Sequence, residues 1–158
     1  GLRRAHPGVR WTDPAGWHLT VVFLGWVPAD RVDAVERALG RAAARVPPFT
    51  LALTGAAGSF RSGVAWAELE EQPALARLAA AAAGELGAVV ELPGEGRPFR
   101  AHLTLARAGR RPAEAREVAG SYRGPASRWD VERVVLMRSH LSKSGARYET
   151  VGAWPLGG

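Results

Sequence analysis

The stretch HLTVVFLG at residues 18–25 has a second copy, HLTLARAG, at residues 102–109. The offset of 84 residues continues past the end of each copy. At that offset three further identities and three conservative matches are found: Gly25 with Gly109, Pro28 with Pro112, Ala29 with Ala113, Val21 with Leu105, Asp30 with Glu114 and Asp33 with Glu117. Each copy therefore predicts a strand, a glycine turn and the start of a helix. Two copies at this long period indicate a duplicated, bilobal domain with a pseudo-two-fold axis rather than a solenoid.

The repeat places two of the four histidines in equivalent positions. Because side chains alternate along a strand, His18 and Thr20 share one face while the leucine between them points to the other. The same alternation puts His102 and Thr104 on one face of the second copy. If the two halves face each other, two imidazoles and two hydroxyls converge on one central cleft.

Two imidazoles on either side of a phosphate can divide the work of acid–base catalysis. The neutral imidazole accepts a proton from an attacking water, and the protonated one donates to the leaving oxygen. The threonine hydroxyls can hydrogen-bond the phosphoryl oxygens as negative charge develops there. This chemistry requires no metal, and strained rings such as ribose 2′,3′-cyclic phosphates are suitable substrates for it.

Composition excludes several other kinds of site. The 158 residues contain no cysteine, which rules out disulfides, cysteine nucleophiles, Cys-rich zinc sites and iron–sulfur clusters. Neither a signal peptide nor an apolar run of membrane-spanning length is found, so we expect a cytoplasmic protein without a membrane segment. The net charge is +6, and all but one of the 21 basic residues are arginine. The positive charge alone does not distinguish a phosphate-binding site from a general compositional bias toward arginine.

The remaining patterns predict one α+β domain over residues 1–158, with antiparallel sheets lining the cleft and helices packed outside. Residues 55–62 and the Gly/Pro-rich residues 93–98 are expected to be loops, and residues 142–145 a hairpin turn. The expected helices cover 28–46, 73–87 and a short stretch from 112, and the expected strands cover 18–25, 49–53, 63–69, 89–92, 99–106, 131–141 and 146–154.

A structural role for the histidines is the main alternative to a catalytic one. A single His-x-Thr on a strand is more often an ordinary core or surface pattern, but two copies in one register favour function. A metal site held by two histidines lacks a third ligand at any suggestive spacing. His6 and His140 have no counterpart in the repeat and are interpreted as solvated.

The paired motifs resemble those of the two-histidine phosphoesterase superfamily, whose members carry two His-x-Thr/Ser-x motifs. Here the motifs are HLTV at 18–21 and HLTL at 102–105. Their surroundings, WHLTVVFLG at 17–25 and FRAHLTLAR at 99–107, are similar to those of the RNA 2′,3′-cyclic phosphodiesterases, also called 2′-5′ RNA ligases. The second motif departs from that family at Ala101, where proline is more usual. The resemblance extends over nearly the whole chain.

The resemblance implies hydrolysis of RNA 2′,3′-cyclic phosphate ends to 2′-phosphates, with 2′-5′ joining of RNA ends as a related activity. His18 would donate the proton to the departing O3′ and His102 would accept one from water, while Thr20 and Thr104 would bind the phosphate. No cofactor is implied. RNA ends, tRNA fragments among them, are the expected partners of a monomer. Family members begin with a strand and a helix ahead of Gly1, and we expect these to be missing here.

Four further residues are candidates for substrate binding. Arg107, at the end of the second motif's strand, resembles the family pattern. It lies five residues after His102, and an odd spacing directs its side chain to the opposite face of the strand unless a bulge intervenes. Arg100 is two residues before His102, so on a strand both side chains would point to the same face. Phe60 and Trp66 are candidates for stacking on a base, with core packing as the alternative. Two other functions stay open: a related phosphoesterase acting on small nucleotide cyclic phosphates, and a non-catalytic module that binds RNA ends.

Overall fold

A computed structural model describes residues 1–94, 98–142 and 145–157. The chain divides into two compact units that alternate along the sequence. Unit 1 comprises residues 1–19, 51–71 and 101–129, and unit 2 comprises residues 20–50, 72–100 and 130–158. The prediction of a single domain over residues 1–158 stays a prediction.

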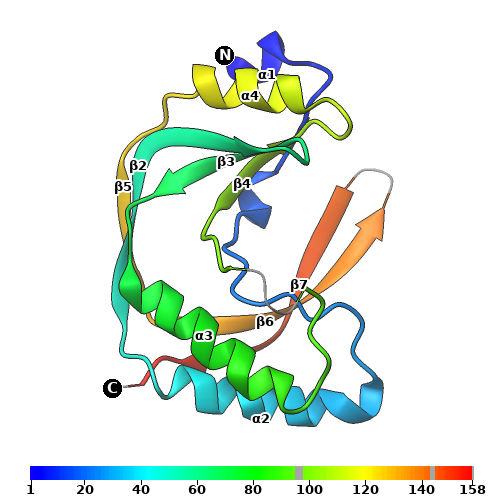
Figure 1. The fold of residues 1–158 in the computed structure, drawn as a ribbon, viewed down its shortest axis with the longest axis vertical. Helices are drawn as coiled ribbons and strands as arrows, with labels where there is room; N and C mark the ends of the chain where they lie inside the picture. The colour runs from blue at the N-terminus through cyan, green and yellow to red at the C-terminus, as the bar shows by residue number, and fades with distance from the viewer. Residues whose placement is uncertain (95–97, 143–144, 158) are drawn as a thin grey trace. The chain divides into compact units, whose positions relative to one another are not determined.

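Most of a five-stranded sheet of order β1-β4-β3-β2-β5 belongs to unit 1, while residues 49–50 of β2 and 130–131 of β5 are assigned to unit 2. The pairs β1–β4, β4–β3 and β3–β2 are antiparallel. Helix α4 lies beside the short helix α1, as Figure 1 shows in yellow and blue. The strands are β1 (Arg10–Trp11), β2 (Phe49–Phe60), β3 (Val64–Leu69), β4 (Leu103–Arg107) and β5 (Ser127–Val131), and the helices are α1 (Leu2–Ala5), the 3₁₀ turn η1 (Pro14–Gly16) and α4 (Pro112–Ser121).

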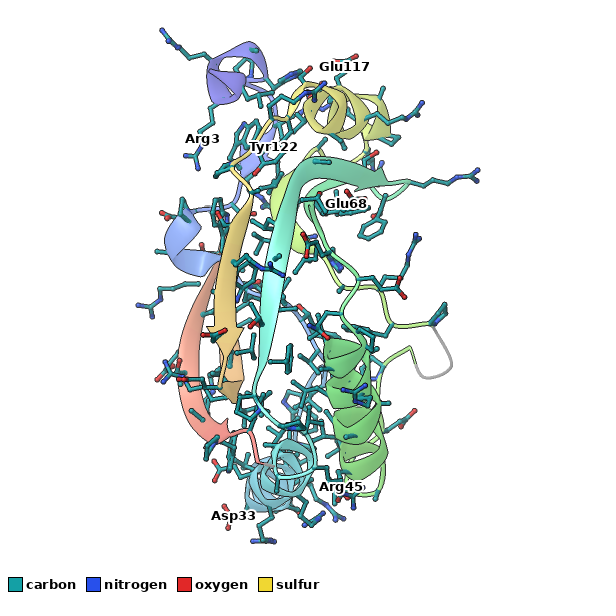
Figure 2. The ribbon with its side chains drawn as sticks, turned by 90° about the vertical axis from the view of Figure 1, so that its left-hand side faces the viewer. Arg3, Asp33, Arg45, Glu68, Glu117 and Tyr122 are labelled. Carbon is teal, nitrogen blue, oxygen red and sulfur yellow. The ribbon has the colours of Figure 1, made fainter. Side chains whose placement is uncertain are left out.

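One face of the unit 1 sheet forms the core with α4. Leu103 and Leu105 of β4 are buried there, and Val118 supplies the buried face of the helix. Tyr122, labelled in Figure 2 just after α4, packs against the same cluster. The core is rich in alanine where strands and helix approach closely. Its buried members are Val9, Ala65, Ala67, Leu103, Leu105, Ala106, Ala108, Ala115 and Val118.

A β-bulge interrupts β4 in the middle. Ala65 of β3 pairs with Ala106, but Trp66 pairs with Thr104, so Leu105 is an extra residue on β4. Leu105 and Ala106 are consequently buried one after the other, and the alternation of faces shifts by one residue beyond them. Arg107 then pairs with Val64, which lies on the same face of β3 as Trp66.

Unit 2 contains two helices and a long hairpin. The turn η2 (Ala29–Arg31) leads into α2 (Val32–Ala43), and α2 contacts α3 (Pro73–Gly87). The hairpin pairs β6 (Arg133–Ser142) with β7 (Gly145–Pro155). Apolar side chains of all three parts fill two buried clusters, because each helix buries one face. The fully buried members include Val35, Leu78 and Leu86.

Charged side chains join the two helices of unit 2 at their surface. Arg41 Nε lies 2.7 Å from Glu85 Oε2, and Arg45 Nη2 lies 2.5 Å from Glu85 Oε1. Arg45 is labelled in Figure 2 at the helices of this unit. The hydrogen bond from Arg41 and the positive charges of both arginines lower the pKa of the Glu85 carboxyl below its ordinary value, against a smaller opposing effect of burial. The carboxylate therefore stays ionised at neutral pH.

The structure confirms the α+β class with antiparallel sheets and most of the predicted elements. Helix α3 has the predicted bounds, and the hairpin is present; its predicted turn includes residues 143–144, outside the described part. Residues 55–60, expected to be loop, continue β2 past an irregularity between Leu53 and Ala57. Residues 89–92 are not a strand, β4 begins only at Leu103, and β1 and β5 were not predicted. Of the predicted loop 93–98, residues 95–97 lie outside the described part.

The predicted strand 18–25 is wrong except at one residue. Leu19 forms a single antiparallel bridge with Leu103, and the following residues are irregular. The side chains of Val21, Val22 and Leu24 instead pack against the core of unit 2. A β-branched, apolar run has strand propensity, but packing contacts decide its conformation.

The two copies of the repeat nevertheless share their turn geometry. Gly25 and Gly109 both adopt positive φ, 67° and 59°, which is the left-handed conformation that favours glycine. In each copy a proline three residues later precedes or begins a helix: Pro28 precedes η2 and α2, and Pro112 begins α4. The duplication is thus visible in the turns and helix starts. The pseudo-two-fold arrangement of two lobes around a cleft stays a prediction.

Candidate active site

The first histidine motif is joined to the second by the bridge between Leu19 and Leu103. Both leucines pack against the core of unit 1. Since neighbouring residues of an extended chain point to opposite faces, His18, His102 and Thr104 lie on the face away from this core. The antiparallel register places His18 across from Thr104. All three residues are half-buried.

The backbone fixes the orientation of the His18 ring. Its Nδ1 lies 2.8 Å from the carbonyl oxygen of Gly16. A carbonyl can only accept, so the proton of this hydrogen bond belongs to Nδ1. The turn that presents the carbonyl is η1, which Asp13 caps by accepting a hydrogen bond from the Ala15 amide at 3.0 Å. In the predicted role of His18 as a proton donor, the proton would move through Nε2, and this role stays a prediction.

An aromatic side chain contacts the second histidine. The rings of Phe60 and His102 have centroids 5.0 Å apart at an interplanar angle of 87°, an edge-to-face arrangement. Phe60 also contacts Trp66, with centroids 5.5 Å apart. Phe60 is the last residue of β2, so the sheet places its ring beside His102. This contact between Phe60 and a histidine was not predicted from the sequence, which suggested base stacking or core packing, and stacking of Phe60 on a base stays a prediction.

Trp66 lies on the same face of the sheet, directly opposite Thr104 on β4. Its indole ring covers Gly58 on β2, where a Cβ would overlap the ring. Its indole N–H is buried and has no hydrogen-bond acceptor among the described residues. Since Gly58 and Phe60 both contact its ring, the packing alternative explains part of its environment, and stacking on a base stays a prediction.

The bulge brings Arg107 to the face of the histidines. Without the extra residue Leu105, an odd spacing from His102 would direct Arg107 toward the core, but the shifted register pairs it with Val64 on the Trp66 face. Arg107 is exposed. The sequence left this placement dependent on a bulge, and the structure contains one. Whether Arg107 binds phosphate stays a prediction.

Two predicted phosphate ligands belong to the other unit. Thr20 follows Leu19 directly along the chain, and Arg100 precedes His102 by two residues; both are assigned to unit 2 and both are exposed. Their roles stay predictions. His140 lies on the hairpin of unit 2, where its Nε2 is 2.8 Å from Glu149 Oε2. That hydrogen bond is the main factor lowering the pKa of the Glu149 carboxyl.

No group of three or more His, Asp or Glu side chains in residues 1–94, 98–142 and 145–157 is arranged to hold a metal ion. Over the same ranges no helix is both long and apolar enough to cross a membrane.

Comparison with known proteins identifies the family to which a chain with this fold and these paired motifs belongs. A model of the 2′-5′ RNA ligase superfamily matches residues 9–143, and the chain belongs to this family. Two curated relatives are named RNA 2′,3′-cyclic phosphodiesterase. The protein from Geobacillus stearothermophilus is 32% identical over 92% of this chain, and that from Escherichia coli K12 is 32% identical over 88%. The chain spans 47% of the length of the first and 75% of the second.

Solved structures agree with this assignment of the family. E. coli LigT complexed with 3′-AMP is 26% identical, with a TM-score of 0.74 over 98% of this chain and 86% of that one. The protein TT0787 of Thermus thermophilus is 29% identical, with a TM-score of 0.76 over 98% of this chain and 86% of that one.

Proposed function

We propose that this protein is an RNA 2′,3′-cyclic phosphodiesterase whose acid and base are His18 and His102. One observation supports the proposal: the bridge between Leu19 and Leu103 pairs the residues next to His18 and His102 within unit 1, and Nδ1 of His18 is engaged by a backbone carbonyl. The names of the curated relatives support the substrate class. Because both histidines come from one chain, a monomer is sufficient for activity.

The proposed reaction is an in-line displacement at phosphorus. His102 accepts a proton from water as the water oxygen bonds to phosphorus, and the bond from phosphorus to O3′ breaks. His18, protonated on both nitrogens, donates the Nε2 proton to O3′. The products are a 2′-phosphate and a free 3′-hydroxyl. Thr104, and by the repeat Thr20, hydrogen-bond the non-bridging oxygens, where charge increases in the transition state.

The same geometry accommodates a second nucleophile. If the 5′-hydroxyl of another RNA replaces water, the same displacement forms a 2′-5′ phosphodiester and again releases O3′. This is the ligation after which the superfamily is named. We propose RNA ends, tRNA fragments included, as the substrates of both reactions.

The decisive experiment is hydrolysis of a short RNA ending in a 2′,3′-cyclic phosphate, in the presence of EDTA. We expect cleavage that persists in the chelator and yields a 2′-phosphate, identified against synthetic standards. A 3′-phosphate product would show that O2′ is the leaving group. Activity that appears only after a metal is added would contradict the proposed mechanism, and RNA binding without hydrolysis would favour a non-catalytic module.

Phe60 offers a test of how His102 is oriented. Replacing Phe60 by leucine keeps an apolar side chain but removes the edge-to-face contact, which is worth about 0.5–1.5 kcal/mol. We expect kcat to fall by about 2- to 10-fold with KM nearly unchanged, and Phe60→Tyr to retain most of the activity. A rise in KM at constant kcat would instead support the stacking of Phe60 on a base. Steady-state kinetics on the cyclic-phosphate RNA distinguishes the two roles.

A further inference from the structure

A cavity of about 410 Å³ lies within unit 1, at the edge formed by β1 and β4. Three arginines line it together with a serine from the β2–β3 turn: Arg10, Arg107, Arg111 and Ser62. We call this cavity the arginine subsite. Arg107, which the β4 bulge turns to the face of the histidines, and its direct partner Arg10 on β1 border the cavity from that face. Arg111 is the residue before α4, the helix that packs on the other face of the sheet.

The pairing of Arg10 with Arg107 is electrostatically unfavourable. The two residues are directly opposite each other in the antiparallel β1–β4 ladder. Like charges at such positions destabilise a sheet unless something compensates them. Both side chains are exposed, and within the described residues neither has a carboxylate within 4 Å. Two guanidinium groups that line one cavity without an internal counter-ion form a site for an anion.

The third arginine of the cavity is held in place by the protein. Arg111 Nη1 lies 2.7 Å from Glu114 Oε1, and its Nη2 donates to the carbonyl oxygen of Gly8. These contacts fix the guanidinium at the wall of the cavity. They also neutralise part of its charge, so Arg10 and Arg107 supply most of the positive potential. The Ser62 hydroxyl adds an uncharged donor at the same place.

The position of the subsite along β4 relates it to the proposed reaction. Thr104, across from His18, and Arg107 pair with Trp66 and Val64, which are two residues apart on β3, and this corresponds to about 7 Å along the sheet. A polynucleotide whose terminal phosphate lies at Thr104 can therefore extend its next phosphate toward the arginines. Arg107 stands at the border of the two sites, and Arg10 and Arg111 lie beyond it.

We propose that the arginine subsite binds the phosphodiester on the 5′ side of the terminal nucleotide. The enzyme then selects oligonucleotides over cyclic mononucleotides, which have no such phosphodiester. This inference rests on the proposed function, since it assumes that the cyclic phosphate reacts at the histidines. It assigns to Arg10 a role in substrate selection and none in the chemical step.

The test compares adenosine 2′,3′-cyclic phosphate with a diadenosine substrate that carries one internal phosphodiester and the same cyclic end. We expect Arg10→Gln to lower kcat/KM about tenfold for the dinucleotide, mainly through KM, because one charge-assisted contact is lost. The cyclic mononucleotide should change less than twofold. Arg116→Gln on α4 removes the same charge from an exposed position outside the cavity and should change neither substrate. Equal losses on both substrates, or no loss on either, would overturn the proposal.

Measurements of binding distinguish a failure of the proposed subsite from a failure of the proposed function. If the unmodified protein hydrolyses neither substrate, the proposed function fails, and the subsite is tested with the diadenosine 2′-phosphate product and adenosine 2′-phosphate. We expect Arg10→Gln to weaken the dinucleotide about tenfold and the mononucleotide hardly at all. The salt dependence of dinucleotide binding should lose about 0.7 from its log–log slope, the value for one phosphate contact on a single strand. An unchanged slope and affinity would contradict the subsite.

Discussion

His18→Ala and His102→Ala are each expected to lower kcat for hydrolysis of an RNA 2′,3′-cyclic phosphate by about 10²- to 10⁴-fold, the usual contribution of a general acid or base. Each substitution removes one of the two proton transfers, and the other histidine of unit 1, His6, lies at the end of α1 rather than on the sheet. KM should change much less, because phosphate binding is assigned to other side chains. Initial rates measured by separation of the 2′-phosphate product give both constants.

The matched control is His140→Ala, which removes an exposed imidazole in unit 2 and should leave kcat unchanged. The double variant of His18 and His102 should be scarcely slower than the worse single variant, since a concerted pair acts as a unit. Full activity in either single variant would disprove the two-histidine mechanism, whichever histidine is the acid.

The pH–rate profile carries independent information about the pair. One imidazole must be neutral while the other is protonated, so the unmodified enzyme should give a bell-shaped profile. The pH–rate profile of the residual activity of His18→Ala should lack one limb of the bell, and the profile of His102→Ala should lack the other limb. A profile that is flat between about pH 5 and 8 would contradict the assignment.

Gly63→Ala is expected to destabilise the protein by about 2–5 kcal/mol, as the sum of left-handed strain and overpacking. Gly63 ends the β2–β3 turn with φ of 78°, and an added Cβ would overlap the carbonyl oxygen of Gly109. The same backbone donates to Phe60 O at 3.0 Å and accepts from Ala108 N–H at 2.7 Å, so it has little room to move. Urea denaturation followed by circular dichroism measures the loss of unfolding free energy.

The control for Gly63 is another glycine in the same chain. Gly84 lies within α3, is exposed, and has open space where its Cβ would be. Gly84→Ala should therefore stabilise the protein by about 0.5–1 kcal/mol, because alanine is the better helix former. If Gly63→Ala were as harmless as Gly84→Ala, the close approach of the two turns would be wrong.

The repeat predicted the parts of the fold that depend on local chemistry. Glycines with positive φ and prolines at helix starts recur because turns and caps are specified by a few adjacent residues. Strand 18–25 was wrong since a strand depends on a partner elsewhere in the chain, and only Leu19 finds one. The extension of β2 through residues 55–60 was missed for a related reason: its glycines resemble a loop until β3 pairs with them.

The histidines and threonines of the candidate site were proposed from the repeat, because two copies made the pattern specific. His18, His102 and Thr104 belong to one unit and Thr20 to the other, and the roles of all four stay predictions. The groups that contact the histidines could not be predicted. The Gly16 carbonyl is part of the backbone and carries no residue-specific signal. Phe60 was a candidate in the sequence only because it is aromatic. Its place against His102 depends on the pairing of β2 with β3 and of β3 with β4.

The extra residue on β4 changes how the second motif should be compared between sequences. In a regular strand, a histidine, a threonine and an arginine on one face would follow each other at even intervals. Here Arg107 follows Thr104 by three residues, an odd number, and the extra residue Leu105 shifts the alternation of faces so that both side chains lie on one face. Removing Leu105 would leave every functional residue in the chain and yet rotate Arg107 into the hydrophobic layer. The number of residues between Thr104 and Arg107 therefore decides which face of the sheet Arg107 occupies, even though neither residue itself changes.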